Sequence, residues 1–231
     1  MKKGQGESRA HALLGCIWRG TATTYSMLIG NGYLRSRYCM RAVDGSGDPI
    51  PWFSYPAIEW LRRSVKPWWT ICEYGVGQST IWFAERCAVR GIDINKNWAD
   101  YARWNSIGAK EIICEPDKEK YIRFARGDET LVVIDGDWRH ECARHVAEVR
   151  PAMVLVDNSD VHIDAVTLLR DAYEIFIPFV GFSAGYKESE TALFINPKKR
   201  EPAPTGEQSV AEKLIEKRME DGFIKIDGGM I

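Results

Sequence analysis

The chain has 231 residues, of which 45% are hydrophobic, and its 31 lysines and arginines nearly balance its 32 acidic residues. This composition is typical of one globular domain with a substantial core, and a net charge of -1 excludes a general attraction to nucleic acid or anionic membranes. The longest apolar run near the N-terminus, 12–18, contains Gly15 and ends before Arg19, so it is shorter than the roughly 20 residues of a membrane span. It also lacks a signal-peptide cleavage pattern.

The pattern of cysteines indicates the cellular compartment of the protein. None of the six forms a C-x-x-C pair, and four lie in segments that we expect to be buried strands or helices: Cys72, Cys87, Cys114 and Cys142. Reduced thiols in a core are typical of cytoplasmic proteins. We therefore expect a cytoplasmic protein with no membrane partner.

The first 51 residues are expected to form an N-terminal extension and a linker. Up to Val43 this segment has one acidic residue, Glu7, and seven basic ones: Lys2, Lys3, Arg9, Arg19, Arg35, Arg37 and Arg41. Such a basic arm can contact phosphate groups, although a solvated extension is the favoured explanation of the pattern. The sequence DGSGDPIP at 44–51 is typical of a turn or linker. A helix is then expected over Ile58–Ser64, with Pro56 in its first turn.

The stretch 70–93, TICEYGVGQSTIWFAERCAVRGID, predicts a strand, a glycine turn, a helix and a second strand. Its first five residues form the short, largely apolar run that a buried parallel strand needs. Gly75 and Gly77 allow the backbone to bend sharply and to approach a ligand closely. The helix is expected over Ile81–Cys87, with its free N–H groups facing this turn.

An acidic residue follows the second strand of this unit. Asp93 comes twenty residues after Glu73, at a strand end where a carboxylate can accept hydrogen bonds from ribose hydroxyls. A strand, a glycine bend, a helix and a carboxylate in this order indicate a site for a nucleoside cofactor. A plain turn without a ligand remains the alternative.

The glycine pattern bears on which nucleoside would bind. The dinucleotide fingerprint G-x-G-x-x-G needs a third glycine where this chain has Thr80. The pattern Glu73-x-Gly75-x-Gly77 instead resembles the first motif of class I S-adenosylmethionine-dependent methyltransferases. An acid in this loop suits a cofactor with a cationic amino-acid end and would repel a pyrophosphate. The resemblance implies S-adenosyl-L-methionine as cofactor, bound by residues at strand ends: Glu73, Gly75, Gly77, Ser79, Asp93, Ile94 and Asp135.

Strands and helices continue to alternate after Asp93. Further strands are expected over 111–115, 131–135, 152–157, 174–180 and 191–195. Helices are expected between most of them, over 97–106, 117–126, 138–149 and 161–172. This order requires a parallel sheet with right-handed crossovers and helices on both faces. The segment 181–190 has no helical pattern, so the last two strands can form an antiparallel hairpin.

The predicted fold class is therefore α/β, a Rossmann-like sheet of seven strands that is mostly parallel, with an antiparallel last strand. This plan resembles the class I methyltransferase fold over residues 52–197, the expected catalytic domain. The remaining residues, 198–231, are expected to comprise a linker, an amphipathic helix over Val210–Glu220 and a short strand over Phe223–Ile226. This tail could pack on its own domain or on a second copy in a homodimer, and the sequence leaves both open.

Acidic residues end two further strands. Asp135 follows the fourth strand, and Asp157 and Asn158 follow the fifth, so these oxygen ligands should lie close together above the sheet. Two carboxylates and an amide suit Mg²⁺, whose other positions water and substrate would fill. The arrangement resembles the metal-dependent O-methyltransferases of the catechol and caffeoyl-coenzyme A type, which implies a metal site of Asp135, Asp157 and Asn158. Capping of the following helix by strand-end acids is the alternative.

The chain departs from this family pattern at the position of the base. The resemblance calls for a lysine three residues after the strand-four acid, where this chain has Trp138, followed by Arg139 and His140. We expect the candidate catalytic residues to be Asp135, Asp157 and His140. Alternatively, a metal ion could lower the pKa of the substrate hydroxyl.

The sequence predicts a methyltransferase that acts on an oxygen nucleophile of a small molecule, and the sharper version of this prediction is a form in which Mg²⁺ helps to hold the acceptor. One alternative is a nucleic-acid methyltransferase that uses the basic arm, but no D/N-P-P-Y/F motif is present. Another is a nicotinamide-dependent oxidoreductase, which Thr80 and Glu73 disfavour. A cofactor-type fold without enzymatic activity is the fourth.

Overall fold

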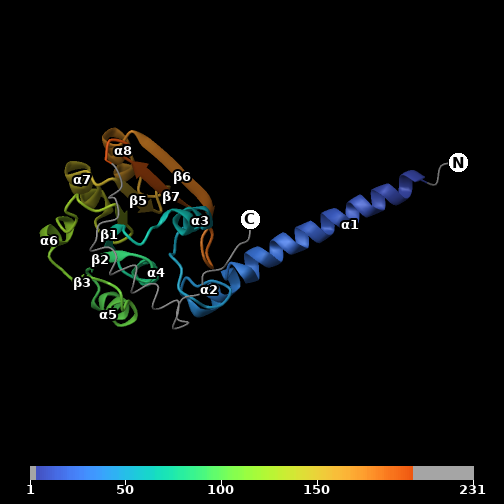
Figure 1. Cartoon of the computed structure of the whole chain (residues 1–231), viewed down its shortest axis with the longest axis horizontal. Coiled ribbons are helices and arrows are strands. Elements are labelled where there is room, and N and C mark those ends of the chain that lie inside the picture. Colours follow the sequence, from blue (N-terminus) through green and yellow to red (C-terminus); the bar gives the residue numbers. More distant parts are fainter. Residues whose placement is uncertain (1–3, 200–231) are drawn as a thin grey trace.

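The computed structural model describes residues 4–199, with side chains from residue 15 onward. The helix predicted over 210–220 and the strand predicted over 223–226 lie outside the described residues. A seven-stranded sheet forms the centre of the molecule (Figure 1). Its strands are β1 (Thr70–Tyr74), β2 (Ala88–Asp93), β3 (Glu111–Cys114), β4 (Leu131–Ile134), β5 (Met153–Asp157), β6 (Ile175–Phe182) and β7 (Glu188–Ile195).

The strand order is β3-β2-β1-β4-β5-β7-β6. The first five strands in this order pair in parallel, whereas β7 runs antiparallel to both of its neighbours, β5 and β6. Strands β1, β2 and β3 follow one another outward on one side, and β4 starts the other side next to β1, so the strand order reverses between β1 and β4. Because β1 and β4 are parallel, the chain leaves both at the same edge of the sheet. The predicted fold class, a mostly parallel seven-stranded sheet with an antiparallel last strand, is confirmed.

Helices cover both faces of the sheet because its central strands alternate between two cores. In β4, Leu131 and Val133 join one cluster of buried residues, whereas Val132 and Ile134 join the other. Two helices pack on the first cluster, α3 (Tyr55–Ser64) and α4 (Gln78–Ala84). Three pack on the second: α6 (Lys118–Ile122), α7 (Arg139–Val149) and α8 (Ile163–Ala172). Helix α5 (Lys96–Asn105) lies beside β2 and β3 (Figure 1).

Several helix bounds differ from the predicted ones for local reasons. Helix α6 ends at Ile122, earlier than expected, where the Tyr74 hydroxyl donates to the Ile122 carbonyl and accepts the Ala125 N–H. The Glu129 carboxylate then accepts the N–H groups of Arg126 and Gly127 in a turn. Helix α8 begins at Ile163, two residues later than expected, because the backbone N–H groups of Val161 and His162 donate to the Asn158 carbonyl. The central strands lie within about one residue of their predicted positions.

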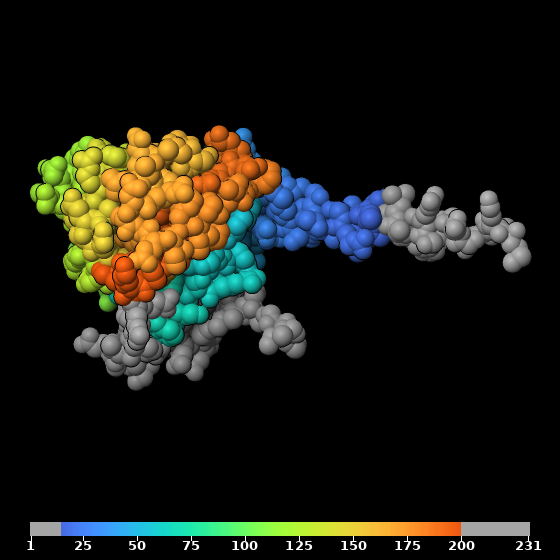
Figure 2. Space-filling model, turned by 90° about the horizontal axis from the view of Figure 1, so that it is seen from above, coloured from blue at the N-terminus to red at the C-terminus, as the bar shows by residue number. Residues whose placement is uncertain are grey.

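The N-terminal segment contains regular structure. It forms helix α1 (Gly4–Tyr25), a π-helical turn η1 (Ser26–Gly30) and helix α2 (Tyr33–Cys39). Helix α1 projects away from the sheet (Figures 1 and 2). The end of the segment returns to the domain, since Ala42 and Ile50 are buried in the same core as α3. In the described part of the chain, no helix is both long and apolar enough to cross a bilayer.

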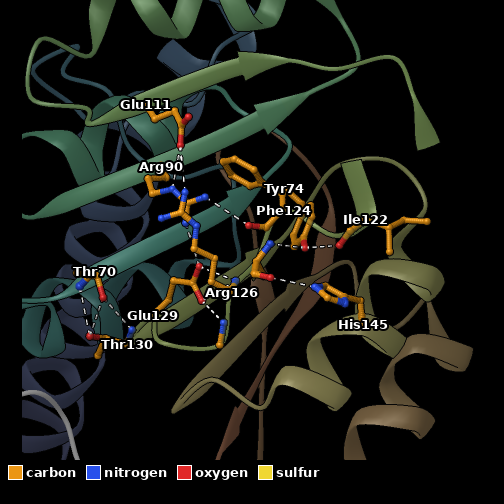
Figure 3. A network of polar contacts seen from close by, with 12 residues as sticks. Thr70, Tyr74, Arg90, Glu111, Ile122, Phe124, Arg126, Glu129, Thr130 and His145 are labelled. Carbon is orange, nitrogen blue, oxygen red and sulfur yellow. Dashed lines mark hydrogen bonds and ion pairs between the residues drawn. The ribbon is translucent and has the colours of Figure 1, made fainter. Parts of the chain in front are cut away.

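A network of charged side chains joins β2, β3 and the segment before β4, away from the edge where the parallel strands end (Figure 3). The Arg90 guanidinium of β2 donates to Glu111 in β3 and to Glu129 before β4, each at 3.1 Å, and lies 4.5 Å from the centre of the Phe124 ring. The Glu129 side chain is 3% exposed and that of Arg90 is 15% exposed. Because both charges are largely removed from water, each depends on the other.

We expect Glu129→Gln to lower the free energy of unfolding by about 3 kcal/mol, because Arg90 then keeps a buried charge with one carboxylate fewer. Urea unfolding followed by circular dichroism measures this change. The matched control is Glu59→Gln, which removes an exposed pair with Arg63 and should cost less than about 1 kcal/mol. Equal losses in the two variants would contradict the assigned role of Glu129.

Candidate functional site

A cavity of about 550 Å³ opens where β1, β2 and β4 end. Three loops that follow these strands form most of its wall, and Trp52 and Trp98 add aromatic surface. The lining residues are Trp52, Gly75, Val76, Gly77, Gln78, Ser79, Asp93, Ile94, Asn95, Trp98, Asp135, Gly136, Asp137 and Arg139. Ligands of open α/β sheets bind at this edge, where the strand order reverses.

The loops after β1 and β4 touch at the floor of the cavity. Gly75 has a φ of +85°, and a Cβ built there would lie 2.5 Å from the Cα of Gly136. A Cβ on Gly136 would in turn lie 2.2 Å from the Tyr121 hydroxyl. The Gly75 N–H also donates to the Ile92 carbonyl at 2.8 Å, which ties the bend to β2. Only glycine fits at both positions, so the two loops present bare backbone to the cavity.

Glu73 lies beneath the glycine bend and does not line the cavity. Its side chain is fully buried, and its Oε2 accepts a 2.5 Å hydrogen bond from the Thr80 hydroxyl. The same hydroxyl accepts the Gly77 N–H at 2.9 Å, so Glu73 supports the bend through Thr80. Burial raises the pKa of Glu73 to about 8, although hydrogen bonds from Ser79 and Thr80 oppose the shift.

Asp93 lines the cavity and fixes the two loops beside it. Its Oδ2 accepts the Val76 N–H at 3.0 Å and its Oδ1 accepts the Asn95 N–H at 2.7 Å. Burial raises its pKa, and these hydrogen bonds oppose the shift. Each carboxylate oxygen can accept more than one hydrogen bond, so Asp93 retains capacity to accept from a bound ligand. Of the residues expected to bind a cofactor, Gly75, Gly77, Ser79, Ile94 and Asp135 also line the cavity.

The groups that end β4 and β5 lie close together, as predicted, but they surround an arginine side chain and not a metal-binding space. The Arg139 guanidinium contacts the Asp135 carboxylate at 3.0 Å and the Asn158 side-chain oxygen at 3.2 Å, and it also donates to the Asp157 carbonyl. A cation therefore already lies among the oxygens predicted to bind Mg²⁺. Within residues 15–199, no group of three or more histidine, cysteine or acidic side chains could hold a metal ion. The donor set does not fit the predicted metal.

The Asp157 carboxylate accepts its side-chain hydrogen bond from Thr191, whereas Arg139 donates to the main-chain carbonyl of the same residue. Asp157 is 3% exposed, and its Oδ1 accepts a 2.7 Å hydrogen bond from Thr191 in β7. The Thr191 hydroxyl also accepts the Ser54 N–H at 3.1 Å. Burial raises the pKa of Asp157, and the nearby Asp135 raises it further. Asp157 thus joins β5, β7 and the start of α3, and does not line the cavity.

His140 lines a different cavity from the other predicted catalytic residues. That cavity has a volume of about 170 Å³ and is bounded by the residues that begin α8, among them His162. The Nε2 atom of His140 lies 3.0 Å from an Arg144 nitrogen. The structure therefore does not bring His140 together with Asp135 and the glycine bend.

Eight lining residues were absent from the set predicted to bind the cofactor or a metal or to act in catalysis: Trp52, Val76, Gln78, Asn95, Trp98, Gly136, Asp137 and Arg139. Trp98 and Asp137 could have been found, because each follows a predicted strand-end acid by a few residues. Gln78 forms a bridge to the N-terminal segment, donating to the Ala42 carbonyl at 3.2 Å. Contacts of this kind, between residues far apart in sequence, have no local sequence signal.

Comparison with known proteins gives remote structural likenesses. No protein-family model and no curated protein sequence matches the chain. The solved structures that it is similar to include cofactor-bound Rv0187 from MTB, at 20% identity and a TM-score of 0.48, over 76% of this chain and 94% of that one.

Two others are a precorrin-6y C5,15-methyltransferase from Geobacter metallireducens and the O-methyltransferase TomG from Streptomyces achromogenes. The first is 11% identical, with a TM-score of 0.48, over 61% of this chain and 87% of that one. The second is 16% identical, with a TM-score of 0.42, over 60% and 77% of the two chains. With TM-scores below 0.5, these likenesses identify neither a substrate nor a mechanism.

The buried Glu73 makes stability depend on pH. Its pKa is raised from 4.5 to about 8, so its contribution is complete below pH 4.5 and is lost as the pH rises towards 8. Between pH 5 and pH 8 we expect wild type to lose up to about 4 kcal/mol relative to Glu73→Gln, measured by urea unfolding at each pH. Glu119→Gln, which removes an exposed carboxylate paired with Arg123, is the control for loss of a surface charge. A constant difference between wild type and Glu73→Gln would refute the raised pKa.

Proposed function

We propose that this protein transfers a methyl group from S-adenosyl-L-methionine to an oxygen nucleophile of a small-molecule acceptor. The observation that carries the proposal is the charge of the cavity wall. Three carboxylates line it, those of Asp93, Asp135 and Asp137, and the one basic residue among the described lining residues is Arg139, whose guanidinium is engaged by protein oxygens. Such a wall favours a ligand that carries positive charge.

The same charge argues against a dinucleotide. A pyrophosphate would meet three carboxylates, and the glycine bend is followed by Thr80, so the third glycine of the dinucleotide fingerprint is missing. A sulfonium nucleoside with an ammonium group brings the opposite charge. Its ribose hydroxyls would donate to Asp93, and its remaining polar groups would meet the bare backbone of the Gly75–Gly77 bend. The resemblance of Glu73-x-Gly75-x-Gly77 to the methyltransferase motif agrees with this assignment.

When bound, the cofactor supplies an electrophilic methyl group, and the chain has to place a nucleophile in line with it. Holding the two reacting atoms about 3–3.5 Å apart in a site shielded from water can supply much of the rate. Asp135 lines the cavity, and its side chain is 24% exposed. Burial raises the pKa of Asp135, with Arg139 opposing the shift, which makes the carboxylate a better proton acceptor for the hydroxyl of an acceptor.

Small-molecule acceptors suit a cavity of this size to which Trp52 and Trp98 add aromatic surface. The six free cysteines agree with our proposal that the protein is cytoplasmic. A nucleic-acid acceptor remains the second candidate, on the evidence of the basic residues near the N-terminus.

Calorimetric titration separates these possibilities. We expect S-adenosylmethionine and S-adenosylhomocysteine to bind with a stoichiometry of one, and NAD not to bind. Binding of NAD, or of none of the three, would refute the proposal. A panel of hydroxylated small molecules with a labelled methyl donor then identifies the acceptor. Labelling of RNA or DNA in its place, with binding that weakens steeply as salt rises, would favour the second candidate.

The role of Asp93 is tested by Asp93→Asn. We expect S-adenosylhomocysteine to bind about 10- to 100-fold more weakly, because an amide cannot replace the charged acceptor of the ribose hydroxyls. An amide nitrogen would also face a backbone N–H of Val76 or Asn95. Asp171→Asn, an exposed change in α8, is the matched control and should bind as wild type does. An unchanged dissociation constant for Asp93→Asn would remove this residue from the site.

A further inference from the structure

We propose that the Arg139 guanidinium is a built-in cation that takes the place of a divalent metal ion where β4 and β5 end. The sequence brings two carboxylates and an amide to this edge, which is the donor set of a magnesium site. The structure fills the space between the strand ends with the chain's own positive charge. The inference deepens the proposed function, because it says how this end of the cavity is held.

The contacts of Arg139 account for every donor of its side chain. A guanidinium has five N–H groups in a rigid plane. Nε donates to the Gly136 carbonyl at 3.0 Å, Nη2 donates to the carbonyl and the carboxylate of Asp135 at 2.7 and 3.0 Å, and Nη1 donates to the Asp157 carbonyl and to Asn158 Oδ1. Five oxygens from the two strand ends thus surround one planar cation.

The backbone on both sides is held in an unusual conformation that aims these groups at one another. Trp138, immediately before Arg139, has a φ of +48°, and Asn158 has a φ of +52°. This region is rare for a bulky residue such as tryptophan. The Trp138 ring packs edge-on against Tyr121, with the ring centres 5.2 Å apart, which fixes the turn. The Arg139 side chain is consequently only 12% exposed.

This arrangement has two consequences for binding. A divalent ion would have to displace a buried guanidinium from oxygens that already hold it, and the Asp157 carboxylate is already engaged by the Thr191 hydroxyl. In addition, Arg139 keeps no N–H group for an acceptor. Arg139 is therefore a positioning residue that fixes Asp135 and the two strand ends, and the acceptor is not held by chelation to a metal.

The first test measures metal binding on the full chain without cofactor. We expect calorimetric titration of wild type with Mg²⁺ and with Mn²⁺ to show no saturable binding. Saturable binding with a stoichiometry of one that disappears in Asp135→Asn would overturn the proposal. Because no cofactor is present, this result does not depend on methyl transfer. Failure of the chain to bind S-adenosylhomocysteine would instead count against the proposed function alone.

The second test measures what the guanidinium holds. Arg139→Gln and Arg139→Lys should lower the thermal midpoint by about 5–10 °C, since a lysine has three N–H groups and glutamine has no charge. Arg123→Gln is the control, because that side chain is 74% exposed, and its midpoint should stay within about 1 °C of wild type. The lysine variant provides the measurement if the glutamine variant does not fold.

The effect of Mn²⁺ on the thermal midpoint separates a cation-replacing role of Arg139 from a purely structural one. We expect Mn²⁺ to raise the midpoint of Arg139→Gln, where the oxygens have lost their cation, and to leave wild type and Arg123→Gln unchanged. Midpoints of both Arg139 variants that equal that of wild type would overturn the proposal. An equal Mn²⁺ shift in wild type and in Arg139→Gln would overturn it as well.

Discussion

The site depends on a contact between two backbones that carry no side chains where they meet. Gly75 and Gly136 follow neighbouring parallel strands, β1 and β4, which are paired up to Tyr74 and Ile134. The chain therefore leaves both strands at the same level, and the two loops can form one floor only if neither carries a Cβ. A methyl group at either position would separate the loops and move the carboxylates that border the cavity.

The acidic residues of the site fall into two groups by position. Asp93, Asp135 and Asp137 line the cavity and give it a negative wall, whereas Glu73 and Asp157 do not line it and are held by threonine hydroxyls. Burial raises the pKa of both Glu73 and Asp157, so neither contributes a full negative charge at neutral pH. The three lining carboxylates determine which ligands the cavity favours, whereas Glu73 supports the glycine bend through Thr80 and Asp157 joins β5 to β7.

The N-terminal segment takes part in the same architecture. Trp52 forms part of the wall, and Gln78 at the start of α4 connects the site to Ala42 through a buried hydrogen bond. The Tyr101 hydroxyl of α5 donates to Gln78 at 2.8 Å, so three separate segments support one side of the cavity. Residues 42–52 thus belong physically to the sheet domain, while α1 projects from it (Figure 2).

The sequence by itself determined the alternation of strands and helices, because buried parallel strands need short apolar runs and glycine punctuates them. It also determined the glycine bend and the acids at the strand ends, since these follow from position along the chain. Tertiary structure decided which groups meet there. Glu73 is buried under Thr80, Asp157 turns to β7, and His140 faces a second cavity, because each orientation depends on a strand or helix distant in sequence. Arg139 shows this most clearly: four residues after Asp135 it resembles a helix-surface residue, and only the approach of β5 surrounds it with oxygens.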